Sequence, residues 1–236
     1  MNKTLQTIQY LVKSFSGGIL FGCLIILSTI AVTDLVYFLT DRYNTVHPVV
    51  SLTVPFEATT GIFALFFGLA LFIADFKVTL ANGISRKTFL LSNLPTAAIA
   101  AAAFAVFTLA AVKVHGLFWP IHSISEEIYP QIGWGFLLIF QFTQYFLLIT
   151  AGRLIALAYY RSSVPVKWAL SLAPLVLFLV LQQDNIRGGA ITNEIRNYLS
   201  LTLSNPYKAS ASMLAYAILA CGLMYLLIRR APLKDE

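Results

Sequence analysis

Long apolar runs separated by short polar stretches are the feature that most limits how this chain can fold. Five of the six runs reach the roughly 17–25 residues that a helix needs to cross a bilayer. Hydrophobic residues make up 58% of the chain and charged residues 11%, whereas about a quarter of a soluble domain is charged. We therefore predict an all-α integral membrane protein, a single domain over residues 1–236 with six transmembrane helices. The runs are residues 17–39, 54–74, 89–112, 133–158, 168–181 and 210–228.

The positions of the Lys and Arg residues predict the orientation of these helices. If the N-terminus lies in the cytosol, eleven of the 16 Lys and Arg residues fall on the inner side and five on the outer side. Inner loops accumulate positive charge, so we expect both termini on the cytosolic side of the membrane. The basic residues are scattered among short loops instead of forming one basic face, which argues against a nucleic-acid partner.

The first 16 residues predict a helix that lies in the inner interface and does not cross the membrane. Apolar side chains recur at helical spacing on one side, and lysines around the other side can face lipid headgroups. The apolar residues are Leu5, Ile8, Val12 and Phe15, and the lysines are Lys3 and Lys13. We expect this helix to be separate from the first transmembrane helix, which would begin at residue 17.

The fifth apolar run is shorter than the others. Residues 168–181 would form a helix of about 21 Å, and Pro174 interrupts its hydrogen bonds. The hydrocarbon core is about 30 Å thick, so something must complete the crossing. Residues 182–209 carry an amphipathic pattern, and we expect them to form a re-entrant segment in the outer leaflet. A surface loop with one helical turn is the alternative.

Motifs for catalysis and metal binding are missing from the sequence. We find no phosphate-binding loop, no HExxH and no GxSxG, and the Cys and His spacings suit no metal site. We therefore expect no enzymatic activity, no metal and no cofactor in this chain. Four ionisable residues fall near predicted helix ends, where their side chains can reach water. They are Asp34, Asp75, Lys113 and Arg153.

A polar, basic stretch at residues 75–89, which we call the elbow, lies between the second and third apolar runs. Phe76 and Leu80 share one helix face because they are four residues apart. Asn82 and Gly83 form a dipeptide that favours chain reversal. The pattern predicts a short helix that lies across the inner membrane surface and ends in a turn.

The second half of the elbow leads directly into the third apolar run. Ser85 can cap the new helix, and Lys77, Arg86 and Lys87 give the elbow its positive charge. Two interpretations follow. The elbow is either a docking element for another protein or an ordinary inner loop that carries the usual positive charge.

The stretch NGISRKTF at residues 82–89, together with the whole organisation of the chain, resembles the permease subunit of type-2 ABC exporters. Many bacterial members carry a similar Asn-Gly-x-Ser-Arg-Lys/Arg run at this position. The resemblance implies that residues 76–85 correspond to the coupling helix, which in the family sits in a cleft of a separate ATPase. It also implies a dimer with an identical or sibling permease, and ATP and Mg²⁺ bound by the ATPase. The implied coupling residues are Phe76, Lys77, Leu80, Asn82, Gly83, Ser85, Arg86 and Lys87.

The resemblance implies export, and the apolar side chains suggest an amphipathic or lipid-like substrate. A small antimicrobial or cytolytic peptide is the first choice. Residues that could form its path are Phe63, Phe66, Phe67, Phe72 and Pro174, although lipid contact or core packing is the more common role for any one such phenylalanine. Two other functions stay open: an immunity or sensor protein that sequesters a peptide without moving it, and an ion-coupled carrier.

Overall fold

In a computed structural model, the described residues are 3–41, 56–116, 125, 128–129, 133–186 and 189–229. They form seven helices and no β-strand, as predicted for an all-α protein. Six of these helices are long and apolar enough to cross a membrane. The helices are α1 (Lys3–Asp41), α2 (Phe56–Ala81), α3 (Arg86–Gly116), α5 (Trp134–Arg161), α6 (Val164–Ile186), α7 (Ala190–Leu203) and α8 (Pro206–Arg229).

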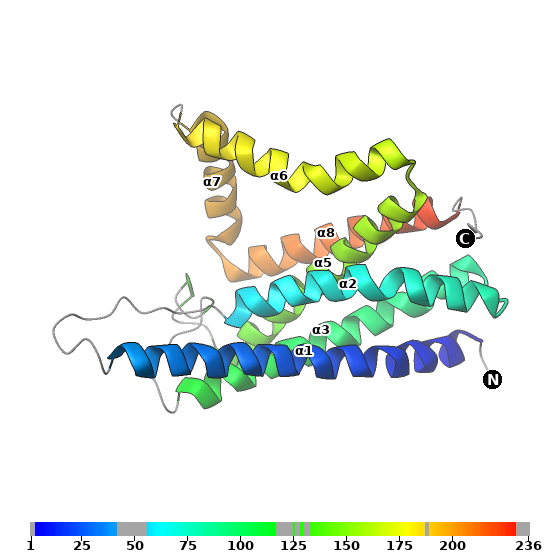
Figure 1. The fold of residues 1–236 in the computed structure, drawn as a ribbon, viewed down its shortest axis with the longest axis horizontal. Helices are drawn as coiled ribbons and strands as arrows, with labels where there is room; N and C mark the ends of the chain where they lie inside the picture. The colour runs from blue at the N-terminus through cyan, green and yellow to red at the C-terminus, as the bar shows by residue number, and fades with distance from the viewer. Residues whose placement is uncertain are drawn as a thin grey trace.

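Helices α2, α3 and α5 form the centre of the bundle, with α1 against α3 and α8 against α5 (Figure 1). Phenylalanine rings interlock in the core that these helices share. The ring centroid of Phe67 lies 5.5 Å from that of Phe15 and 5.4 Å from that of Phe104, both in edge-to-face geometry. This geometry adds to the stabilisation that comes from burial alone.

Helices α2 and α5 approach each other closely at Gly68 and Gly152. A Cβ atom on Gly152 would lie closer than 3.0 Å to the backbone of Leu65, and one on Gly68 would collide with the backbone of Ile149. Lipid tails are as apolar as the side chains, so helices in a bilayer associate largely through close packing at small residues. The two glycines therefore set how closely α2 and α5 can pack.

The separate interfacial helix predicted for residues 1–16 is wrong, because α1 continues without a break from Lys3 to Asp41. Its apolar face packs on the bundle, so Leu11 and Phe15 are buried inside the protein and do not rest on lipid. The hydroxyl of Ser92 on α3 also donates to the backbone oxygen of Thr4, at 3.3 Å. Contacts with α3 thus keep the first turns of α1 in line with the rest of the helix.

The short fifth helix was also predicted incorrectly. Helix α6 has 23 residues and continues through Pro174, which gives it a length of about 34 Å at 1.5 Å per residue. The prediction started the helix too late, because it assigned Lys167 and the residues before it to a loop. No residue in the most apolar window of α6 is buried, and α6 lies apart from the rest of the bundle (Figure 1).

Residues 182–209 contain the predicted amphipathic helix, which is α7; its entry into the outer leaflet stays a prediction. The last turn of α6 extends into them, and α7 then runs crosswise between the ends of α6 and α8 instead of turning back along either helix (Figure 1). Asp184 holds this corner, because its carboxylate accepts hydrogen bonds from the backbone N–H of Thr192 at 2.7 Å and from its hydroxyl at 2.6 Å. Ile191 and Ile195 are exposed, as expected for an amphipathic helix at a membrane surface.

The glycine contact between α2 and α5 leads to a prediction about stability. Gly152→Ala should lower the free energy of unfolding by about 1–3 kcal/mol, because the added methyl group forces the two backbones apart. The measurement is thermal unfolding of the purified protein in detergent. Gly222→Ala on α8 is the control, since nothing lies within 4 Å of a Cβ atom there. Equal melting temperatures for the two variants would contradict the proposed role of the contact.

Candidate functional site

The elbow contains a tight, hydrogen-bonded turn between α2 and α3. Gly83 has φ of 73°, a left-handed conformation that glycine adopts without strain. The N–H of Gly83 donates to the oxygen of Leu80 at 3.0 Å, and the N–H of Ile84 donates to the oxygen of Thr79 at 3.2 Å. This pair of bonds is the Schellman arrangement that ends a helix. The chain reversal predicted from Asn82 and Gly83 is confirmed.

The start of α3 is capped as predicted. The hydroxyl oxygen of Ser85 accepts a hydrogen bond from the N–H of Thr88 at 3.1 Å. Arg86 then reaches across the bundle, where its Nη1 donates to the backbone oxygen of Arg229 at 3.2 Å. That oxygen belongs to the last turn of α8, where a cation is favourable. The elbow therefore has both helix ends capped and is joined to the end of α8.

The predicted short surface helix of residues 76–85 does not form, because α2 continues unbroken to Ala81. Phe76 is completely buried, with its ring centroid 5.4 Å from that of Phe89 and 5.9 Å from that of Tyr160. Leu80 is half-buried against the same core. Phe76 therefore stabilises the bundle and has no surface to offer a partner, which corrects the anchor role predicted for it.

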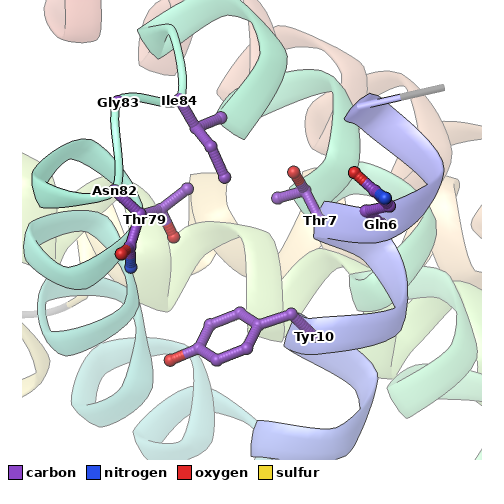
Figure 2. Close-up of a pocket in the computed structure, with 7 residues that line it drawn as sticks. All are labelled: Gln6, Thr7, Tyr10, Thr79, Asn82, Gly83 and Ile84. Atoms are coloured by element: carbon purple, nitrogen blue, oxygen red, sulfur yellow. The ribbon is translucent and has the colours of Figure 1, made fainter. Parts of the chain in front are cut away.

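The surface of the elbow is formed by the turn itself and the residues beside it. Asn82, Gly83, Ser85 and Lys87 are exposed, while Lys77 and Arg86 are half-buried. A cleft of about 330 Å³ lies between this turn and the first turns of α1. Figure 2 shows the Tyr10 and Thr7 side chains of α1 pointing toward the elbow across this cleft. The residues around it are Gln6, Thr7, Tyr10, Thr79, Asn82, Gly83 and Ile84.

The residues predicted to line a substrate path do not share one surface. Phe67 and Phe72 are buried in the core, and Phe63 packs edge to face on Phe104 with ring centroids 5.6 Å apart. Phe66 is 59% exposed. Pro174 is exposed on α6, away from these phenylalanines. Three of the four phenylalanines thus act in core packing, and we find no continuous apolar path among them.

Two charged side chains that the sequence placed near water are buried instead. Arg153 is 2% exposed and Asp75 is 4% exposed, so both predictions of solvent access were wrong. Arg153 Nη1 donates to the backbone oxygen of Asn93 at 2.7 Å, and Asp75 Oδ1 accepts from the Ser14 hydroxyl at 3.1 Å. The burial of Arg153 could have been predicted from its position inside the apolar run of residues 133–158. Buried charges in a membrane segment commonly mark functional sites.

A second buried polar group lies toward the other end of the bundle, and the sequence analysis missed it. The carboxylate of Glu57 accepts hydrogen bonds from the Gln141 side chain at 2.7 Å and from the N–H of Ser125 at 3.0 Å. Close to it, the Tyr145 hydroxyl donates to Thr108 at 3.2 Å. The first two of these bonds satisfy both carboxylate oxygens of Glu57, which would otherwise be costly inside an apolar bundle, while Gln141 Oε1 is buried without a partner. Among the described residues, no group of three His, Cys, Asp or Glu side chains could hold a metal.

Comparisons with known proteins were made at three levels. No protein-family model matches the chain, and no curated protein or solved structure matches it either. The functional argument therefore rests on the residues and contacts described above.

The conformation of the elbow leads to a prediction about its rigidity. Gly83→Ala should cost about 1–2 kcal/mol locally, because a Cβ atom is unfavourable at this positive φ. Hydrogen exchange of the amides at residues 83–88 should then become faster. Gly133→Ala is a matched control, since Gly133 also flanks a helix but has φ of −67° and open space around it. Unchanged exchange in Gly83→Ala would show that the turn does not depend on glycine.

Proposed function

We propose that this chain is the permease subunit of an ABC exporter, and that the elbow receives a separate ATPase. The observation that carries the proposal is the rigid, exposed turn at Asn82 and Gly83, capped on both sides and joined by Arg86 to the end of α8. A rigid turn transmits a rigid-body displacement to the helices attached to it. Here those helices are α2 and α3, which lie at the centre of the bundle.

The ATPase and this chain would have separate roles, because the sequence contains transmembrane helices and no phosphate-binding loop. ATP and Mg²⁺ would be bound by the ATPase, and this chain would supply the membrane path together with a second permease, identical or sibling. The exposed Lys87 and the half-buried Lys77 favour a partner with an acidic surface. The substrate would be amphipathic or lipid-like, with a small antimicrobial or cytolytic peptide as the first choice, because α6 carries a long apolar stretch of which no residue is buried.

The charge at the two ends of the bundle supports a cytosolic elbow in a bacterial cytoplasmic membrane. Positive charge collects on the cytosolic side of membrane proteins. The described basic residues at the elbow end are Lys3, Lys13, Lys77, Arg86, Lys87, Arg161, Lys167 and Arg229, and those toward the opposite end are Lys113, Arg196 and Lys208.

An ion-coupled carrier is a second candidate, because Glu57 and Asp75 are buried carboxylates within the bundle. Carriers use such groups to couple ion movement to transport. The energy source separates the two candidates. Export that stops when ATP is depleted, with the ion gradient maintained, favours the exporter, and the reverse favours the carrier.

The orientation can be tested with single cysteines in a protein whose Cys23 and Cys221 are replaced by serine. Lys208→Cys should react with a membrane-impermeant thiol reagent in intact cells, because it would face outward. Lys87→Cys should react only after the cells are lysed. Both positions are exposed lysines near helix starts at opposite ends of the bundle, so they form a matched pair. Labelling of Lys87→Cys in intact cells would reverse the proposed orientation.

The docking proposal predicts the effect of reversing one charge at the elbow. Lys87→Glu should lower co-purification of an ABC ATPase encoded by an adjacent gene at least about fivefold, because like charges would meet at the contact. Export by whole cells should fall in parallel, while the amount of protein in the membrane stays the same. Lys208→Glu makes the same change at the other end and should have no effect. Wild-type co-purification and export in Lys87→Glu would remove the main support for docking at this turn.

A further inference from the structure

The side chains of Asp75 on α2 and Arg153 on α5 carry opposite charges and are both buried inside the bundle. Consecutive residues of α1 contact the two groups and show that they lie close together. The hydroxyl of Ser14 donates to Asp75 Oδ1 at 3.1 Å, and the ring of Phe15 lies under the Arg153 guanidinium at 5.4 Å. The carboxylate and the guanidinium therefore lie against the same turn of α1.

Neither charged group is fully satisfied in this arrangement. Asp75 Oδ2 and Arg153 Nη2 are both buried, and neither atom has a hydrogen-bond partner. A buried polar atom without a partner costs about 1–3 kcal/mol, and more when the group is charged. A direct hydrogen bond between the two atoms would remove both penalties at once. A closer approach of the Asp75 and Arg153 side chains would therefore be favourable.

Other bonds hold the two groups back from each other. Ser14 holds Asp75 from the side of α1, and the backbone oxygen of Asn93 holds Arg153 Nη1 on the side of α3, at 2.7 Å. A shift of α2 toward α5 would exchange the Ser14 bond for a bond to Arg153. Going from the first position of Asp75 to the second would therefore break one hydrogen bond, to Ser14, and form another, to Arg153.

The glycine contact provides a pivot for such a shift. Gly152 precedes Arg153 directly in α5, whereas Gly68 lies seven residues before Asp75 in α2, or about 10 Å along the helix. Small rotations about the contact of the two glycines leave their backbones touching but displace the elbow end of α2. Asp75 would move with that end, while Arg153 stays near the pivot.

We propose that Asp75 and Arg153 form a two-position switch, in which the elbow end of α2 rotates about the Gly68–Gly152 contact between a Ser14-bound and an Arg153-bound position of Asp75. The switch belongs to the bundle itself and does not rest on the proposed ATPase. It gives the elbow two positions relative to α5. The competing explanation is an ion pair with a fixed geometry, which would give the elbow only one position relative to α5.

The test measures the distance between spin labels at Ala81 and Ser163, two exposed positions at the elbow ends of α2 and α5. The full-length protein, with Cys23 and Cys221 replaced by serine, is placed in lipid nanodiscs without any partner. We expect two distance populations. Ser14→Ala should raise the ratio of the shorter to the longer population about twofold to tenfold, because it removes the hydrogen bond that retains Asp75.

The double variant Asp75→Asn with Arg153→Gln should leave a single population, because the attraction is gone. Glu57→Gln also removes a buried carboxylate but lies outside the switch, so it should keep both populations in the wild-type ratio. If the double variant does not fold, the population ratio in Ser14→Ala alone tests the proposal, because that substitution removes no buried charge and should leave the fold intact. A single population in the wild type, an unchanged ratio in Ser14→Ala, or two populations in the folded double variant would overturn the proposal. None of these measurements depends on an ATPase, so their failure is distinct from failure of the exporter proposal.

Discussion

The backbone contact between Gly68 and Gly152 is the constraint on which the rest of this bundle depends. Apolar side chains gain little by leaving lipid for one another, so a membrane bundle needs surfaces that fit closely. With α2 and α5 in contact at their backbones, Phe67 can pack edge to face on both Phe15 and Phe104. The same spacing leaves Asp75 and Arg153 buried at the elbow side of the contact.

The sequence predicted well those features that are set by local signals. Six apolar runs correspond to six described helices long enough to span a membrane, and five of the runs already had that length, which responds directly to bilayer thickness. The turn at Asn82 and Gly83 and the cap at Ser85 were also predictable. Each depends only on the conformational preference of glycine or on the reach of one hydroxyl group, so no knowledge of the neighbouring helices is needed.

Features set by packing between helices could not be predicted in the same way. Asp75 directly follows an apolar run, where the sequence alone fits solvent access as well as burial, whereas the position of Arg153 inside a run favoured burial without showing which groups surround it. Phe76 and Leu80 form an apolar pair that suits a surface helix or the last turns of a core helix. Which of the two forms depends on whether Phe89 and Tyr160 lie beside Phe76, and this is determined by the tertiary structure. The break predicted after residue 16 failed for the same reason, since contact with α3 keeps α1 straight.

Burial of Phe76 changes how a force applied at the elbow would travel. An exposed docking helix would bind through its own apolar face and be linked to the bundle by a turn. In this protein Phe76 and Phe89, on the two sides of the turn, pack on each other, and Phe76 also packs on Tyr160 of α5. A displacement of the turn therefore reaches α5 through packed aromatic rings, at the end of α2 that also carries Asp75. Closely packed cores respond to such a shift by changing between discrete arrangements and deform little within each one.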